Sequence, residues 1–231
     1  MRHKVCAPLS AGGVSVERVN GLFVVFEGGD GVGKSTQTRL LADWLRSRGH
    51  EVIVTFEPGE GPIGRQIRDI LLSPDTEDLS PRAEALLFAA DRAQHVHSLI
   101  EPALRRGATV ISDRYVDSTL AYQGAGRALD VAEIERINWW ATGDLRPDLV
   151  VLLDLDPERG LAAAGVPDRM ESAGSDFHDR VREGFLALAA KDPERYLVLH
   201  ARDSIENTAA AVRTRVAALL EDSENRPEVG A

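Results

Sequence analysis

Five short apolar segments recur along the chain, and none of them alternates cleanly between apolar and polar positions. They are LFVVFE (22–27), EVIVTFE (51–57), ATVISDR (108–114), LVVLLDLD (149–156) and YLVLHA (196–201). Short runs of this kind are typical of strands that are covered on both faces. Segments with helical spacing lie between and after them, at 35–48, 62–72, 80–106, 130–142, 176–190 and 205–221. This order predicts an α/β fold with a five-stranded parallel sheet and helices on both faces.

The turn after the first predicted strand is rich in glycine and reads GGDGVGKST from Gly28 to Thr36. It fits G-x-x-x-x-G-K-[ST], a loop whose backbone N–H groups bind phosphate at the start of a helix. An ordinary glycine-rich turn is the alternative, but the flanking strand and helix favour the phosphate loop. We therefore predict nine ATP-binding residues: Gly28, Gly29, Asp30, Gly31, Val32, Gly33, Lys34, Ser35 and Thr36. Lys34 would reach the β/γ-phosphates, and the Ser35 hydroxyl would bind Mg²⁺.

Composition narrows the class of protein further. A chain of 231 residues suits one domain, and a net charge of −10 argues against a general nucleic-acid binder. Cys6 is the single cysteine, which excludes a disulfide framework and indicates a reducing, cytoplasmic location. Asp154 interrupts the longest strand-like apolar run, so we expect no membrane span. We expect a flexible extension at 1–20, one domain at 21–221 and a disordered tail at 222–231.

A phosphate loop alone does not distinguish a kinase from a switch GTPase, but the guanine-reading motif N-K-x-D is absent. A small-molecule kinase also needs an acceptor pocket. Phe88 and Arg92 are spaced i,i+4 on a predicted helix, so they share one face and could stack on and hydrogen-bond a base. The alternative is that Phe88 belongs to the core and Arg92 to the solvated surface.

The segment after the third predicted strand offers further polar groups. Asp113 could orient the magnesium shell and Arg114 could hold a phosphate, or the two could form an ion pair that caps the strand. The QGAG stretch (123–126) is interpreted as a mobile turn.

Taken in order, the segments resemble those of the thymidylate kinase family from about Gly21 to Leu220. FEGGDGVGKSTQ, EPGEGPIGRQIR, RAEALLFAADRAQH, SDRYVDSTLAYQGAGR and PDRMESAGSDFHDRVREGF follow one another in the family's order. The resemblance implies a P-loop NTPase fold with a lid at about 157–176. It also implies ATP-dependent phosphorylation of dTMP to dTDP, a step in dTTP synthesis, by in-line transfer with Mg²⁺ as cofactor. The implied partners are ATP, dTMP and a second copy of the chain, with no nucleic acid and no membrane.

The resemblance also assigns roles to individual residues. Phe88 would stack on thymine, Arg92 would bond its O4, and Tyr122 would lie against the deoxyribose. The substrate-binding residues implied are Glu57, Arg68, Phe88, Arg92, Arg114, Thr119, Tyr122 and Gln123, with Thr119 and Gln123 near N3 of the base and Arg68 and Arg114 at the phosphate. Asp30 would face the 3′-hydroxyl or the magnesium site. The implied metal set is Ser35, Asp113 and Glu57, and the implied catalytic set is Lys34, Arg114, Arg169 and Asp30.

Two departures from the family pattern concern charge. Phe56 stands where bacterial members usually have arginine, and the loop and lid contain few arginines, with Gly31 in the loop. Arg159 and Arg169 are the remaining candidates for neutralising the transferring phosphoryl group. We expect Arg169 to do so, because PDRMES aligns with the end of the family's lid, whereas Arg159 could only cap the fourth strand.

Other residues are given plainer interpretations. Trp139 and Trp140 are expected in the core, and His95 and His97 are expected to pack or face solvent rather than bind a metal. Two alternative functions stay open, another nucleoside-monophosphate kinase and a P-loop switch or regulatory ATP-binding module. The module would need no slot built from Phe88 and Arg92.

Overall fold

A computed structural model describes residues 21–76, 78–163, 169–170, 173–201 and 203–224. All five predicted strands are present within this part of the chain. They are β1 (Phe23–Glu27), β2 (Val52–Phe56), β3 (Thr109–Asp113), β4 (Leu149–Asp154) and β5 (Tyr196–His200). They form one parallel sheet in the order β2-β3-β1-β4-β5. The predicted α/β architecture is therefore confirmed.

The helices follow the predicted spacing closely. They are α1 (Lys34–Arg46), α2 (Gly61–Leu72), α3 (Pro81–His95), α4 (Glu101–Arg105), α5 (Val116–Thr119), α6 (Val131–Thr142), α7 (Pro157–Ala163), α8 (Ser175–Lys191) and α9 (Ile205–Glu224). Two π-helical turns, η1 (Val96–Ile100) and η2 (Leu120–Gly126), join α3 to α4 and extend α5. The predicted helix 80–106 is thus α3, η1 and α4 in succession, with Pro102 in the first turn of α4.

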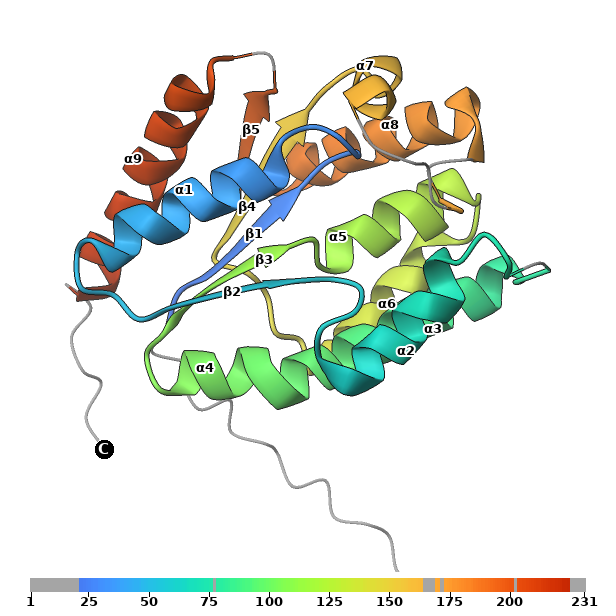
Figure 1. The fold of residues 1–231 in the computed structure, drawn as a ribbon, viewed down its shortest axis with the longest axis horizontal. Coiled ribbons are helices and arrows are strands. Elements are labelled where there is room, and N and C mark those ends of the chain that lie inside the picture. Colours follow the sequence, from blue (N-terminus) through green and yellow to red (C-terminus); the bar gives the residue numbers. More distant parts are fainter. Residues whose placement is uncertain (1–20, 77, 164–168, 171–172, 202, 225–231) are drawn as a thin grey trace, which may run out of the picture.

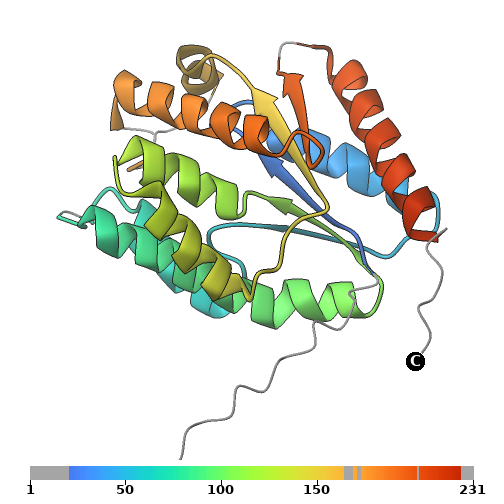
Figure 2. The same ribbon diagram turned by 180° about the vertical axis from the view of Figure 1, so that it is seen from behind.

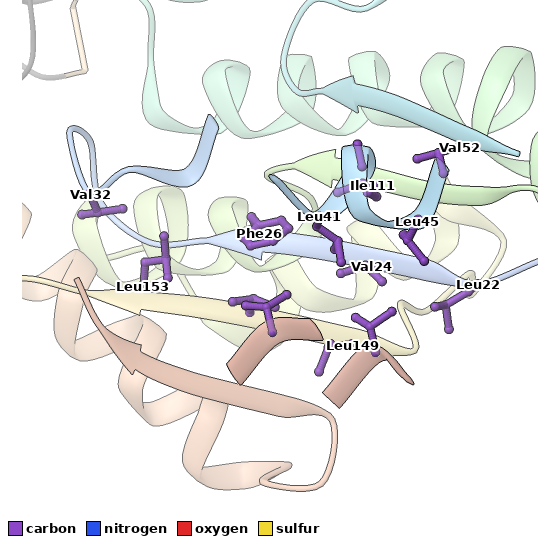
Figure 3. Close-up of a cluster of buried hydrophobic side chains, with 14 residues drawn as sticks. Leu22, Val24, Phe26, Val32, Leu41, Leu45, Val52, Ile111, Leu149 and Leu153 are labelled. Carbon is purple, nitrogen blue, oxygen red and sulfur yellow. The ribbon is translucent and has the colours of Figure 1, made fainter. Parts of the chain in front are cut away.

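Helices cover both faces of the sheet (Figures 1 and 2). Side chains of β1 alternate between these faces, and all five are buried. Val24 and Phe26 enter the cluster formed with α1 and α9 (Figure 3), while Phe23 and Val25 enter the one formed with α3, α4 and α6. A third cluster lies between β4, η2 and α8.

Local signals in the sequence account for several helix boundaries. Ser80 caps α3 by accepting from the N–H of Ala83 at 3.3 Å, and Asp130 caps α6 by accepting from Ala132 and Glu133. Gly143 ends α6 in the left-handed conformation that suits glycine. Among the described residues, no helix is long and apolar enough to cross a membrane.

The structure corrects the expectations for Trp140 and for the start of the C-terminal tail. Trp139 is buried as expected, but Trp140 is 83% exposed, because neighbouring residues on a helix point about 100° apart. Helix α9 continues to Glu224, so residues 222–224 are helical rather than part of a disordered tail. The predicted extension 1–20 and the remaining tail 225–231 lie outside the described residues.

The interpretation of QGAG as a mobile turn is wrong. These residues belong to the buried turn η2, which packs against α8. A Cβ on Gly126 would lie 2.6 Å from a ring carbon of Phe177, and one on Gly184 would lie 3.0 Å from Cβ of Ala125. The small residues therefore allow two helical segments to approach each other closely.

Candidate active site

The glycine-rich loop connects β1 directly to α1. Gly28 and Gly33 have φ of 132° and 93°, values that glycine adopts readily, and a Cβ on Gly28 would lie 2.4 Å from the carbonyl oxygen of Leu153. Within the described residues no side chain caps the first turn of α1, which borders an open cavity of about 830 Å³. Free N–H groups and the helix dipole make this end of α1 suitable for binding phosphate.

Lys34 lies at the first position of α1 and folds back over the loop. Its ammonium group donates to the carbonyl oxygens of Gly28 at 3.2 Å and Gly29 at 2.6 Å. Burial, together with the neighbouring charge of Arg114, lowers the pKa of Lys34 to about 8. A phosphate in the loop would supply the negative charge that favours its protonated form.

Two of the three predicted metal ligands face each other. The Ser35 hydroxyl donates to Oδ2 of Asp113 at 3.1 Å, which joins the start of α1 to the end of β3. One hydroxyl and one carboxylate suit Mg²⁺, which usually completes its shell with water and substrate phosphates. Both oxygens of Glu57 are engaged elsewhere, and no cluster of three or more metal-binding side chains occurs in the part of the chain that is described.

Arg114 links the phosphate loop to η2. One terminal nitrogen donates to the carbonyl oxygen of Gly28 and to Ser118, both at 3.1 Å, and the other donates to Asp30 and to Tyr122. The Tyr122 hydroxyl donates to the second oxygen of Asp30 at 2.9 Å. Arg114 adopts φ of 73°, an uncommon value for a residue with a side chain. Of the two alternatives for Arg114, the strand-capping pair with Asp113 is not formed, and its ion-pair partner in the described structure is Asp30.

The same contacts control the charge of Asp30. Burial would raise the pKa of this carboxyl, but the charges of Arg114 and Lys34 and the hydrogen bond from Tyr122 outweigh it. The pKa is therefore below its usual value, and Asp30 is ionised at neutral pH.

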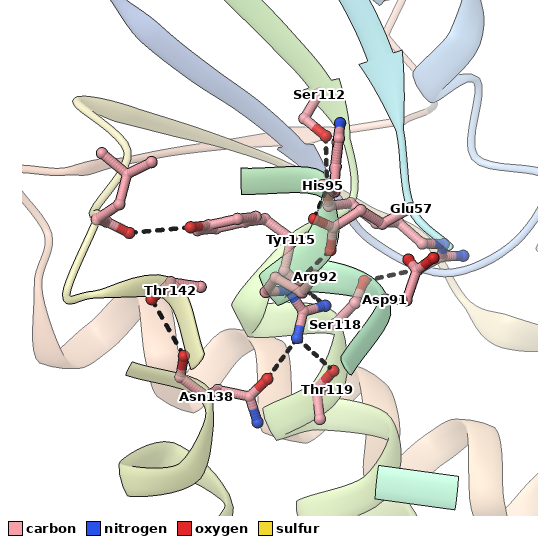
Figure 4. A network of polar contacts seen from close by, with 12 residues as sticks. Glu57, Asp91, Arg92, His95, Ser112, Tyr115, Ser118, Thr119, Asn138 and Thr142 are labelled. Atoms are coloured by element: carbon pink, nitrogen blue, oxygen red, sulfur yellow. Dashed lines mark hydrogen bonds and ion pairs between the residues drawn. The ribbon is translucent and has the colours of Figure 1, made fainter. Parts of the chain in front are cut away.

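Arg92 is the centre of a buried polar network (Figure 4). Its guanidinium donates to Glu57 at 2.7 Å, to Thr119 at 2.9 Å, to the carbonyl oxygen of Tyr115 at 2.8 Å and to Asn138. His95 lies beside it, with its two ring nitrogens on Thr55 and on the other oxygen of Glu57. Arg92 is only 1% exposed, so its interpretation as a solvated surface residue is wrong.

A second cavity, of about 180 Å³, lies next to the phosphate loop. Its walls contain eight residues assigned above to substrate or catalysis: Asp30, Glu57, Arg68, Phe88, Arg114, Thr119, Tyr122 and Gln123. Phe88 is half-buried at this wall rather than part of the core. Arg92 does not line the cavity and lies behind Thr119 and Glu57.

Arg68 of α2 borders both cavities, and it is held there by the loop that connects β2 to α2. Its guanidinium donates to the carbonyl oxygen of Pro58 at 2.6 Å and lies 5.9 Å from the centre of the Phe56 ring. The backbone N–H of Gly59 donates to Asp91 of α3, which fixes the loop from the other side. Phe56 therefore lies beside the Arg68 guanidinium, at the position where the family resemblance leads us to expect an arginine.

The two lid arginines lie in different surroundings: Arg169 lies beside α2 and α3, whereas Arg159 lies on α7, whose Gly160 packs against the backbone of Asp30. Arg169 donates to the carbonyl oxygen of Leu71 at 2.8 Å and pairs with Glu84 at 2.6 Å. Arg159 is exposed on α7, where its backbone N–H bonds the carbonyl oxygen of Asp156. Residues 164–168 and 171–172 of the predicted lid lie outside the described residues.

Several buried charged residues were not identified from the sequence. Glu27 accepts from the N–H of Tyr115 at 2.9 Å and from the hydroxyl of Ser118 at 2.6 Å, and burial together with Asp117 raises its pKa to about 8. Glu84 binds Gln123 on one side and two arginines on the other. Glu27 could have been noticed in the sequence, because it is a carboxylate at the end of the apolar run LFVVFE.

Comparisons with known proteins agree with this arrangement. A family model described as thymidylate kinase matches residues 26–212. The chain is 54% identical over 202 residues to a thymidylate kinase of Cutibacterium acnes, covering 87% of this chain and 99% of that relative. It is also 54% identical over 206 residues to one from Clavibacter michiganensis subsp. michiganensis, covering 87% and 97%. A crystal structure of thymidylate kinase from Ehrlichia chaffeensis matches with a TM-score of 0.70 at 32% identity, covering 85% of this chain and 98% of that one.

Proposed function

The chain belongs to the thymidylate kinase family and catalyses the ATP-dependent phosphorylation of dTMP to dTDP. From this premise we propose which residues bind ATP, which bind dTMP and which stabilise the transferred phosphoryl group. The observation that carries the assignment is the position of the second cavity. Arg114 forms hydrogen bonds both to the phosphate loop and to the cavity wall, so it lies between the donor and acceptor positions.

On the donor side, residues 28–36 bind ATP. The N–H groups at the start of α1 surround the phosphates, and Lys34 turns from the carbonyl oxygens of its own loop toward the β/γ-phosphates. Ser35 and Asp113 would hold Mg²⁺, which neutralises charge on the phosphate oxygens. Glu57 borders both cavities, so it would act between the metal and the acceptor phosphate, while Arg92 and His95 hold its two oxygens in place.

On the acceptor side, the 180 Å³ cavity binds dTMP. Phe88 stacks on the base, Thr119 and Gln123 meet its N3 edge, and Tyr122 lies against the sugar. Arg68 and Arg114 bind the phosphate that receives the phosphoryl group. Arg92 serves the base through Thr119, whose hydroxyl oxygen accepts from Arg92 and whose proton is free to donate.

The reaction needs no covalent intermediate on the protein. In-line transfer requires two aligned phosphates and neutralised charge, which Lys34, Arg114 and Arg68 provide by position. Arg169 would join them only by leaving Glu84 and the carbonyl oxygen of Leu71.

A coupled assay with ATP and a panel of monophosphates tests the acceptor assignment. We expect dTMP to be preferred over UMP, CMP and AMP, and Arg92→Ala to lose base discrimination together with rate. Equal phosphorylation of UMP, CMP or AMP would favour the alternative of another nucleoside-monophosphate kinase.

We also propose that the chain forms a homodimer through α2, α3 and α6. Helix α3 packs against both α2 and α6, and the three helices lie side by side (Figure 1). Each exposes large apolar side chains. The residues are Ile63 and Ile70 on α2, Leu86 on α3 and Trp140 on α6. Burial of such a surface against a second copy would remove it from water.

The cytoplasmic location proposed for the enzyme is supported by the single cysteine.

A further inference from the structure

Glu84 is a carboxylate buried behind the acceptor cavity. Its side chain is 1% exposed and is bound by three side chains, one from η2, one from the residue just after η2, and that of Arg169. Gln123 of η2 donates through Nε2 at 2.9 Å, Arg127 donates through two nitrogens at 3.2 Å, and Arg169 contacts it at 2.6 Å. The residue itself is not part of the cavity wall, so it can act on a ligand only through another side chain.

Two arginines keep this carboxylate ionised. Burial would raise the pKa of Glu84, but the hydrogen bonds from Arg127, Gln123 and Arg169 outweigh it, and the pKa is below its usual value. An ionised carboxylate only accepts hydrogen bonds. Gln123 must therefore present its amide nitrogen, not its carbonyl oxygen, to Glu84.

The orientation of Gln123 matters because its amide has two ends of equal shape and opposite polarity. With the nitrogen on Glu84, Oε1 forms the other end, and no other described residue hydrogen-bonds to it. Gln123 lines the acceptor cavity. With Nε2 held against Glu84, the acceptor Oε1 is available to a ligand in this cavity.

We propose that Glu84 is a positioning residue that fixes the amide of Gln123 with Oε1 toward the acceptor base, and thereby selects bases that carry an N–H at position 3. This inference rests on the proposed placement of the base beside Gln123. Thymine and uracil have a donor at N3, whereas cytosine has an acceptor there. An acceptor facing Oε1 would leave both groups unpaired, and such a mismatch is rejected strongly in a buried site.

The substitution Glu84→Gln tests the proposal, because a neutral amide at this position pairs with Gln123 in either orientation. The two substrates to compare are dTMP and 5-methyl-dCMP, which share the methyl group and differ at N3 and position 4. We expect the ratio of their kcat/KM values to fall by at least about tenfold, while the ratio of dTMP to dUMP stays within about twofold. A uniform loss on all three substrates, or an unchanged ratio of dTMP to 5-methyl-dCMP, would overturn the proposal.

Two further variants separate the possible reasons for failure. Arg127→Gln removes one partner of the cluster but leaves the carboxylate and Arg169, so the ratio of dTMP to 5-methyl-dCMP should stay within about twofold. Gln123→Leu should reduce this ratio. If Gln123→Leu changes neither that ratio nor the KM for dTMP, the placement of the base is wrong. If Gln123→Leu reduces the ratio and Glu84→Gln does not, only the role of Glu84 is wrong.

A measurement on the unsubstituted protein covers the case in which Glu84→Gln does not fold. The side-chain NH₂ signals of Gln123, identified by their loss in Gln123→Leu, should resist solvent exchange both before and after dTMP is added. The imino proton of bound dTMP should become observable at the same time. A large shift of the Gln123 NH₂ signals on dTMP binding, without a protected imino proton, would show the opposite orientation and refute the proposal.

Discussion

The surroundings of the Lys34 ammonium group in the phosphate loop determine its pKa. The group is surrounded by carbonyl oxygens of its own loop and lies close to the charge of Arg114. Burial and Arg114 disfavour the charge on the ammonium group, and a bound phosphate would add a negative charge that favours it.

We therefore expect ATP binding near pH 8 to be accompanied by proton uptake. Burial and Arg114 lower the pKa of Lys34 to about 8, whereas a polyphosphate beside the ammonium raises it. The uptake should approach roughly half a proton at about pH 8 and disappear below about pH 6, where Lys34 is already charged. Calorimetry in buffers of different ionisation enthalpy measures this quantity. Lys34→Arg stays charged throughout, so an equal uptake in that variant would contradict the assignment.

Phe56 gives a second prediction for a single residue. Its ring is 43% exposed and lies under the Arg68 guanidinium, which we place at the dTMP phosphate. Phe56→Ala should raise the KM for dTMP by roughly two- to fivefold with little change in kcat, as expected for loss of an exposed cation–π contact. Val54→Ala is the matched control, since Val54 is equally exposed on β2. Like Phe56, it borders the cavity at the start of α1. Equal effects of the two variants would mean that Phe56 does not support Arg68.

At the scale of elements, the close contact between η2 and α8 holds one wall of the acceptor cavity. Gly126→Ala would place a methyl group 2.6 Å from Phe177 and 3.0 Å from Val181. We expect a loss of about 1–3 kcal/mol in the free energy of unfolding, the usual cost of overpacking. Urea denaturation measures this loss. Gly124→Ala is the comparison, because the three atoms nearest its new Cβ all belong to Val131, the closest at 3.2 Å. A loss as large as that of Gly126→Ala would argue against the packing explanation.

The sheet and most helices could be predicted because their signals are local. Apolar runs, the N-caps Ser80 and Asp130, and the glycine loop each lie within a few residues. The π-helical turn η2 could not be predicted in this way, since Gly126 serves a contact with α8 that lies about fifty residues further on. Likewise, helical periodicity alone does not say which of Trp139 and Trp140 faces the core.

In the candidate site, too, residues that lie close together in the sequence could be predicted, and those that depend on distant partners could not. The phosphate-loop residues are contiguous, so one motif identifies them together, and the family resemblance supplies the cavity residues. Glu84 and Asn138 were given no role, and His95 only that of a packing or solvent-facing residue, because their partners Gln123, Arg92 and Glu57 lie tens of residues away. Only the fold shows that Arg92 lies behind the cavity wall rather than in it.

At the scale of the whole molecule, the proposed dimer makes a clear prediction for Trp140. This side chain is 83% exposed on α6, and its burial against a second copy would contribute strongly to association. We expect the unsubstituted chain to be a dimer by light scattering and Trp140→Glu to be largely monomeric at micromolar concentration. Leu186→Glu on α8 is the control, since Leu186 is 36% exposed outside the surface of α2, α3 and α6. Dissociation by the control alone would place the interface elsewhere.

The hydrogen bonds of Arg114 have a consequence for how the two substrates influence each other. One guanidinium contacts Gly28 and Asp30 of the donor loop and also Ser118 and Tyr122 beside the acceptor cavity. A ligand that reorients this group for its own phosphate changes the free energy of filling the neighbouring cavity. Thermodynamic reciprocity then requires ATP to alter the affinity for dTMP by the same factor by which dTMP alters the affinity for ATP. Through one arginine, the kinase couples two binding equilibria before any phosphoryl group is transferred.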